Sequence, residues 1–225
     1  MFEALRRFFS GVCRLTPEIL RNIRPQERVK LKLTETSNPH LLSSVYRLLW
    51  NRRAMFSLEI WKEGEDDVSF FASADRNDAI EELLRRLMAV YALPSFEHAT
   101  ISLPEECYVS AGYLKLSGKA YMLRDLEHDP LTHALAAADN VLIQFLFRPE
   151  RIAVERFGYE SPVFKLRVAV AVFADDWKKA TNACRRVLES FTVLSSAHTA
   201  LVPVLPRIPN SCALLRSMIE QKFLP

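Results

Sequence analysis

The stretch EHDPLTH groups His128, Asp129 and His133, which are residue types that can bind zinc. Helices that hold a metal through two histidines place them at positions i and i+4 on one face. A helix that begins at Pro130 contains only the second of these histidines, and Asp129 stands where the N-cap of that helix belongs. The stretch therefore favours a capped helix start, and no metal is expected.

Glycine and lysine do not combine into a nucleotide-binding loop. The motif GxxxxGK[ST] wraps phosphates with backbone N–H groups and holds magnesium through its hydroxyl. Gly112 and Gly118 are followed by Lys119, but they are one residue too far apart and Ala120 replaces the hydroxyl residue. The GxSxG elbow of hydrolases and the RNP1 pattern of RNA-binding sheets are also missing. We therefore expect no cofactor, no small-molecule substrate and no enzyme; the alternative is an enzyme whose pocket forms only in three dimensions.

The elements between residues 28 and 106 follow the order βαββαβ. RVKLKLTE reads as a strand, and SNPHLLSSVYRLLWNRR has apolar residues at helical spacing. MFSLEIWK and VSFFAS alternate as strands on either side of the turn EGEDD. A helix over residues 73–91 and the strand HATISL complete the unit.

The same order returns between residues 107 and 206. GYLKLSGKAYML reads as a strand or a bent pair of strands, and DPLTHALAAADN reads as a helix. VLIQFLF and FKLRVAVAVF are predicted strands, residues 175–191 a helix, and ALVPVL the last strand. Under an offset of 100 residues, SADRNDAIEELLRRLMAVY aligns without a gap with FADDWKKATNACRRVLESF.

The repeated order predicts an α+β protein with two tandem, duplicated ferredoxin-like βαββαβ units and antiparallel sheets. Each unit carries its helices on one face and leaves the other face open, so two units are expected to hide those faces or their sheet edges against one another. Residues 1–27 are an N-terminal helix and linker, and residues 207–225 are a C-terminal helix that leaves the body.

The N-terminal helix, predicted over residues 1–23, is amphipathic. It either packs on the body or lies on a membrane surface, where apolar and basic side chains act together. The apolar runs are too short for a membrane-spanning helix, and Arg6, Arg7 and Arg14 interrupt the apolar core that a signal peptide needs. The chain is therefore expected in the cytoplasm, with peripheral contact at the inner membrane face as an alternative. The membrane-surface candidates are Leu5, Arg6, Arg7, Phe8, Phe9, Val12 and Arg14.

Basic residues are concentrated near one end of the chain. Up to Lys62 there are 12 Lys and Arg against 5 Asp and Glu, or +7, and the remainder has 18 against 22, or −4, which sum to the net charge of +3. These basic residues form either a solvated face or a surface that contacts DNA or an anionic membrane. The candidates for partner or nucleic-acid contact are Arg47, Arg52, Arg53, Arg148, Arg151 and Arg156, the last three in or beside a long connection over residues 148–162.

The four cysteines, Cys13, Cys107, Cys184 and Cys212, are far apart and form no CxxC motif. They are therefore predicted to be buried free thiols.

The order of landmarks resembles the N-terminal domain that precedes the motor in conjugation-type ATPases of type IV secretion systems, in forms common in archaea and some bacteria. The segments YALPSFEHA and DPLTHALAAADNVLIQFLFRPE carry the resemblance, which runs from about Leu42 to Val204. It implies a docking and scaffolding domain that works with a P-loop ATPase or secretion complex. No position of this chain matches the motor's catalytic residues. The alternative is a stand-alone nucleic-acid-binding protein that uses the basic loops.

Overall fold

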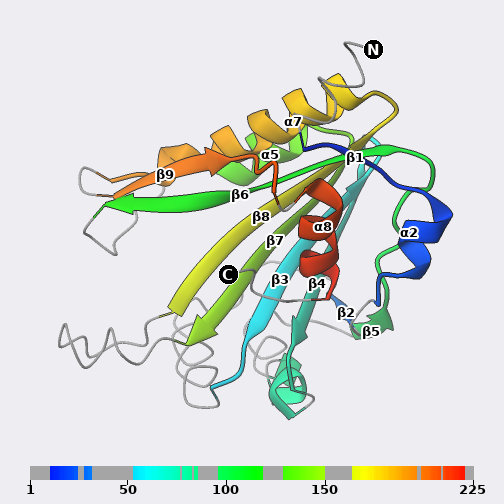
Figure 1. The fold of residues 1–225 in the computed structure, drawn as a ribbon. Coiled ribbons are helices and arrows are strands. Elements are labelled where there is room, and N and C mark those ends of the chain that lie inside the picture. The colour runs from blue at the N-terminus through cyan, green and yellow to red at the C-terminus, as the bar shows by residue number, and fades with distance from the viewer. Residues whose placement is uncertain are drawn as a thin grey trace.

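A computed structural model of the protein describes residues 11–24, 28–31, 53–76, 78–82, 84–85, 96–118, 129–149, 164–196, 199–208 and 210–220. It is a mixed α+β structure in which helices lie on a curved antiparallel sheet (Figure 1). The predicted fold class is confirmed at this level. The first predicted helix, in residues 37–53, falls almost wholly outside the described residues. Residues 78–82 and 84–85 of the second predicted helix are helical.

Nine strands form one sheet in which every described pairing is antiparallel. The order is β1-β6-β8-β7-β3-β4-β2-β5, and β9 also pairs with β6. The strands are β1 (Cys13–Arg14), β2 (Arg28–Leu31), β3 (Phe56–Glu63), β4 (Asp67–Ala74), β5 (Phe96–Ala99), β6 (Tyr108–Gly118), β7 (Asn140–Pro149), β8 (Phe164–Ala174) and β9 (Thr199–Val204).

The sheet has two halves that meet between β3 and β7. In β5-β2-β4-β3 and in β9-β6-β8-β7 the strands follow the same order: fourth, first, third and second along the chain. The halves join edge to edge, with Glu59 opposite Gln144 and Phe56 opposite Phe147. The sheet is therefore continuous across the junction, and its two faces extend over both halves.

Helices cover both faces of this sheet. The helices α5 (Pro130–Ala136) and α7 (Trp177–Ser190), followed by the 3-10 turn η1 (Phe191–Leu194), lie on one face, while α2 (Pro17–Arg21) and α8 (Ser211–Ile219) lie on the other (Figure 1). Alternation along β8 shows the division: Val170 packs in the core beneath α7, and Ala171 packs in the core beneath α8. Asp129 caps α5, with Pro130 at the first position, as predicted.

The C-terminal helix does not leave the body, which corrects the sequence-based prediction. Leu214, Leu215, Met218 and Ile219 of α8 are all buried against the sheet. The physical reason is that the α5 and α7 side of the sheet already has its helices, and the opposite face still presents apolar side chains. The apolar stripe of α8 covers that face.

A single helix over residues 1–23 is also wrong for the part that the structure describes. Arg14 lies in β1, paired with Tyr108 of β6, and Val12 directly precedes this strand. A separate helix, α2, starts after Thr16, whose hydroxyl accepts a hydrogen bond from the Ile19 N–H. The other membrane-surface candidates, Leu5 to Phe9, lie outside the described residues.

Two of the four cysteines are bonded, contrary to the prediction of free thiols. Cys13 of β1 and Cys212 of α8 form a disulfide with their Cα atoms 5.6 Å apart and 199 positions apart in sequence. The spacing along the chain could not indicate this pair because only the folding of α8 onto β1 brings the two together. Cys107 and Cys184 are free thiols.

Candidate functional site

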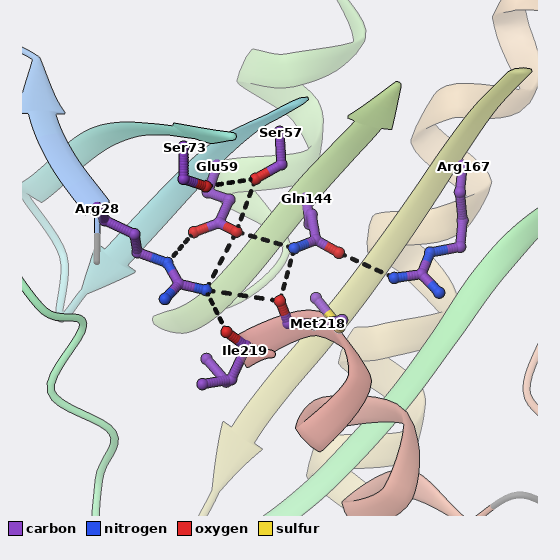
Figure 2. Close-up of polar contacts among 8 residues, drawn as sticks. All are labelled: Arg28, Ser57, Glu59, Ser73, Gln144, Arg167, Met218 and Ile219. Carbon is purple, nitrogen blue, oxygen red and sulfur yellow. Dashed lines mark hydrogen bonds and ion pairs between the residues drawn. The ribbon is translucent and has the colours of Figure 1, made fainter. Parts of the chain in front are cut away.

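A network of polar side chains lies between the sheet and the C-terminal end of α8. It joins Arg28 of β2, Glu59 of β3, Gln144 of β7 and Arg167 of β8, and it reaches the last carbonyl groups of α8 (Figure 2). Arg28 and Gln144 are 0% exposed and Glu59 is 1% exposed. Charged groups are rarely buried this deeply unless they are paired, so the site has been built around specific partners.

Strand register brings these side chains together. In β3, Ser57, Glu59 and Trp61 point to the α8 side, because alternate residues of a strand face opposite ways. Glu59 lies directly opposite Gln144, and Ser57 lies directly opposite Ser73. The junction of the two halves therefore passes through the centre of the network.

Glu59 is the acceptor on which most of the network converges. Arg28 donates from Nε to Oε2 and from Nη2 to Oε1, the second at 3.2 Å, which makes a forked ion pair. Oε1 also accepts from Gln144 Nε2 at 2.8 Å and from Ser57 Oγ at 3.0 Å. Because the Ser57 hydroxyl has one hydrogen, the 3.0 Å contact between Ser57 and Ser73 has Ser73 as donor.

The network also supplies donors to the C-terminal carbonyl groups of α8. Arg28 Nη2 donates to the Ile219 carbonyl at 2.9 Å, and Gln144 Nε2 donates to the Met218 carbonyl at 2.7 Å. The last four carbonyl groups of a helix have no partner inside the helix, and that end carries partial negative charge. A guanidinium group from one half of the sheet and an amide from the other therefore hold the same helix end.

Arg167 extends the network onto a fourth strand. Its Nη2 donates to Gln144 Oε1 at 3.1 Å, which fixes the orientation of the amide and aims the Gln144 Nε2 at Glu59 and Met218. Burial lowers the pKa of Arg167 to about 10, so this guanidinium still carries its charge at neutral pH. The network contains two guanidinium groups and one carboxylate.

The N-terminal end of α8 is held by separate contacts. Asn210 caps the helix by accepting from the Ala213 N–H, and the Ser211 hydroxyl accepts from the Ala111 N–H of β6. The Ser211 N–H donates to the Gly11 carbonyl at 2.8 Å, beside the Cys13–Cys212 disulfide. Gly11 has φ +73°, and a Cβ there would meet the Pro206 carbonyl oxygen at 2.5 Å, so the close approach requires glycine. Helix α8 is thus attached at both ends.

In this geometry the network positions a helix. The Glu59 carboxylate is buried and its Oε1 already accepts three hydrogen bonds from side chains. Across the portion of the chain that is described, no group of three or more His, Cys, Asp and Glu side chains could hold a metal ion. None of the described helices is long and apolar enough to cross a membrane.

The structure places two of the six candidate arginines. Arg148 lies near the end of β7, and Arg53 lies in the left-handed region with φ 53°, three residues before β3 begins. Because Phe56 pairs with Phe147, both arginines are at the same end of the sheet, and both are exposed. Arg47, Arg52, Arg151 and Arg156 lie outside the described residues.

The residues of the buried network were missed by sequence reasoning, although a signal exists. Glu59, Gln144 and Arg167 each stand between two apolar residues of their strand, in FSLEIWK, VLIQFLF and FKLRVAVAVF. Alternation in FSLEIWK sets Glu59 on the side of the strand opposite Phe56, Leu58 and Ile60, which favours solvent exposure, but that side is covered by α8. A polar residue between apolar residues of a buried strand indicates a buried hydrogen-bond partner. Three strands with this pattern indicate one buried network that they share.

No protein-family model matches the chain, and no curated protein matches it. Among solved structures, the chain is similar to CrmK, a flavoenzyme involved in the shunt product recycling mechanism in caerulomycin biosynthesis. The identity is 14%, the TM-score is 0.43, and the match covers 75% of this chain and 41% of CrmK. The chain thus corresponds to less than half of that protein. At this TM-score the likeness carries no argument about the chemistry of this chain.

The match nevertheless bears on one prediction. We expected a protein that is not an enzyme, and a match to a flavoenzyme contradicts that expectation. The restriction to non-catalytic roles is therefore not retained.

Proposed function

We propose that the chain is a docking and scaffolding domain that works with a DNA-transfer or secretion-type ATPase. The observation that carries the proposal is the attachment of α8 across the junction of the two halves by Arg28 and Gln144. A platform that transmits force between a motor and its partner must not open at an internal seam. The resemblance of YALPSFEHA and DPLTHALAAADNVLIQFLFRPE to the pre-motor domain supports the same role.

We also propose that the two halves are copies of one ferredoxin-like unit. The matching strand order of β5-β2-β4-β3 and β9-β6-β8-β7 supports the duplication, together with the aligned segments at residues 73–91 and 173–191. An experimental structure tests it by superposition of β2, β3, β4 and β5 on β6, β7, β8 and β9. Copies superpose strand on strand with the same directions, whereas reversed directions in any matched pair would refute duplication.

The docking proposal is tested by isolating the tagged protein from its own cells after lysine cross-linking. We expect peptides of a P-loop ATPase, cross-linked to lysines of this chain, and ATP hydrolysis by the isolated complex. The Glu59→Gln variant, which weakens the attachment of α8, should recover less ATPase than Glu65→Gln, a change at an exposed turn. Isolation of the chain alone, or with partners that contain no P-loop, would count against the proposal.

A second candidate function is the binding of nucleic acid. The observation in its favour is that Arg53 and Arg148 lie at one end of the sheet although 95 positions separate them, as 148 − 53. Phosphate contacts release counterions, so the affinity for DNA should fall steeply between low and physiological salt. Weak binding with the same affinity at both salt concentrations would exclude this function.

A further inference from the structure

Three of the four cysteines lie on the α8 side of the sheet, near the start of β6. Cys13 of β1 is directly opposite Val109 of β6 and is bonded to Cys212 of α8. Cys107 lies two residues before Val109, so its side chain faces the same side of the sheet as that of Cys13. All three cysteines pack against the core beneath α8, and Cys107 is a free thiol. A disulfide and a free thiol are therefore neighbours on one face.

The free thiol lies diagonally across from Cys13. The Leu15 N–H donates to the Cys107 carbonyl at 2.8 Å, so the pairing of β1 with the start of β6 continues through Cys107. The Cα atoms of diagonal neighbours in an antiparallel pair are about 7–8 Å apart, whereas those of a disulfide are usually about 4.4–6.8 Å apart. A small shift closes this difference, and β1 is a strand of 2 residues at one end of the described strand order. Cys107 can therefore reach Cys13 without unfolding of the sheet.

We propose that Cys107 exchanges with the Cys13–Cys212 disulfide and so controls the covalent attachment of α8. The Cys107 thiol loses its proton, and the thiolate Sγ forms a bond with Cys13 Sγ. The bond between Cys13 and Cys212 breaks, and Cys212 leaves as a thiolate that takes up a proton. One disulfide and one thiol are present before and after, so the step needs neither an oxidant nor a reductant. The inference goes beyond the docking role proposed above and does not depend on it.

The exchange changes which elements the disulfide joins. The Cys13–Cys212 bond ties β1 to the first turn of α8, 199 positions away in the sequence. A Cys13–Cys107 bond joins β1 to the start of β6, two segments that backbone pairing already holds together. In the exchanged form, the N-terminal end of α8 keeps the hydrogen bonds of Ser211 but loses its covalent bond. Exchange therefore releases the covalent attachment of α8 to β1 and leaves the network at the other end of the helix in place.

The fourth cysteine lies on the other face of the sheet. Cys184 of α7 is fully buried in the core beneath that helix, so the sheet separates it from the disulfide. A thiolate is the attacking species in exchange, and burial raises the pKa of Cys184 to about 12. Cys107 is half-buried and lies on the same face as the disulfide. Of the two free thiols, Cys107 is the one in a position to attack.

The inference is tested by competition between exchange and alkylation in the folded chain. Iodoacetamide is added without reductant at about pH 9, near the ordinary thiol pKa of 9.0. The protein is then quenched in acid, digested with pepsin and mapped by mass spectrometry without reduction. Direct labelling gives alkylated Cys107 with the Cys13–Cys212 bond intact, and exchange gives alkylated Cys212 with a Cys13–Cys107 bond. Because exchange is intramolecular while alkylation depends on reagent concentration, the share labelled at Cys212 should rise several-fold as iodoacetamide is diluted.

Two controls accompany this measurement. Cys107→Ser removes the attacking thiol with little change in size, so Cys212 should stay bonded and unlabelled at every iodoacetamide concentration. Cys184 reports on the fold within the same sample, because it should stay unlabelled as long as the core beneath α7 is closed. Labelling of Cys212 in the unchanged protein, with Cys184 unlabelled, supports the inference.

Four outcomes would overturn the inference. Labelling of Cys107 alone at every concentration would show that no exchange takes place. A Cys107–Cys212 bond would leave α8 covalently attached. Labelling of Cys212 together with Cys184 would show that exchange requires unfolding. Labelling of Cys212 in Cys107→Ser would show that the disulfide opens by a route that does not involve Cys107.

Discussion

At the scale of single residues, Glu59 decides whether the buried network is stable. Its carboxylate compensates the Arg28 guanidinium and accepts from Gln144 and Ser57 in a site without exposed groups. A buried ion pair adds little net stability over apolar side chains, but removal of one partner leaves the other charge uncompensated. Loss of one partner of this ion pair should therefore lower the free energy of unfolding by more than the intact pair contributes to it.

Glu59→Gln keeps the size of the side chain and removes its charge. We expect a loss of about 3–5 kcal/mol in the free energy of unfolding, because Arg28 stays buried and charged. Urea denaturation followed by circular dichroism measures the change. Glu65→Gln, in the exposed turn between β3 and β4, is the control and should change stability by less than about 0.5 kcal/mol. Equal stability of the two variants would contradict the role given to Glu59.

Burial raises the pKa of the Cys184 thiol from 9.0 to about 12, and a hydrogen bond with Ser110 opposes this only partly. A raised pKa means that the folded protein keeps the thiol neutral while the unfolded chain ionises it above about pH 9. The thiol therefore contributes its full stability below pH 9, and the contribution is lost between about pH 9 and 12.

The reactivity of Cys184 follows from the same shift. At about pH 9.5, which lies above the ordinary thiol pKa of 9.0, iodoacetamide should label Cys184 in urea but not in the folded protein. Cys107, whose pKa is also raised by burial but which is half-buried, should be labelled in the folded chain. Mass spectrometry after labelling distinguishes the two sites. Rapid labelling of Cys184 in the folded protein would show that it is not enclosed between the sheet and α7.

Single residues also show where sequence reasoning reaches its limit. Asp129 could be assigned as a cap because its partner, the Leu131 N–H, is two residues away. Arg28, Glu59 and Gln144 could not be assigned to one site, because 31 and 85 positions separate the bonded pairs Arg28–Glu59 and Glu59–Gln144. Local patterns report local contacts, and these contacts depend on the register of strands.

At the scale of elements, α8 is held by chemically different attachments at its two ends. Its first turn carries the disulfide to β1, and its last turn accepts from Arg28 and Gln144. The helix itself was predictable from the spacing of apolar residues in NSCALLRSMIEQKFL. Its position was not, because an apolar stripe shows that a helix is covered without showing which surface covers it.

Reduction of the Cys13–Cys212 disulfide should weaken the fold. The bond closes a loop of most of the chain, and loss of such a cross-link costs about 2–5 kcal/mol through the greater freedom of the unfolded state. Urea denaturation with and without dithiothreitol measures the effect, and Cys212→Ser without reductant should match the reduced protein. Cys107→Ser, which changes a free thiol, should leave the response to reductant intact. An unchanged midpoint on reduction would contradict a stabilising bond.

At the scale of the whole molecule, the two halves of the sheet behave as one body only if their junction resists opening. The edge-to-edge pairing of β3 with β7 supplies a backbone ladder, and stacked rings of Phe56 and Phe147, with centroids 4.6 Å apart, strengthen one end of it. On the opposite face α8 spans the same junction. The repeated order of elements predicted two similar halves, but it left joined faces and joined edges both open, because the pairing of β3 with β7 joins strands that are far apart in the sequence.

The attachment of α8 across the junction is tested most directly by native-state hydrogen exchange, in which the protection of α8 is compared with that of β3, β7 and α7. If the network fastens α8 across the junction, the α8 amides should open with nearly the same free energy as those of β3 and β7. In Glu59→Gln, protection of α8 should fall further than that of α7, which lies on the other face and serves as the internal reference. Rapid exchange of α8 beside a protected sheet, or unchanged protection of α8 in the variant, would contradict the attachment on which the proposed platform depends.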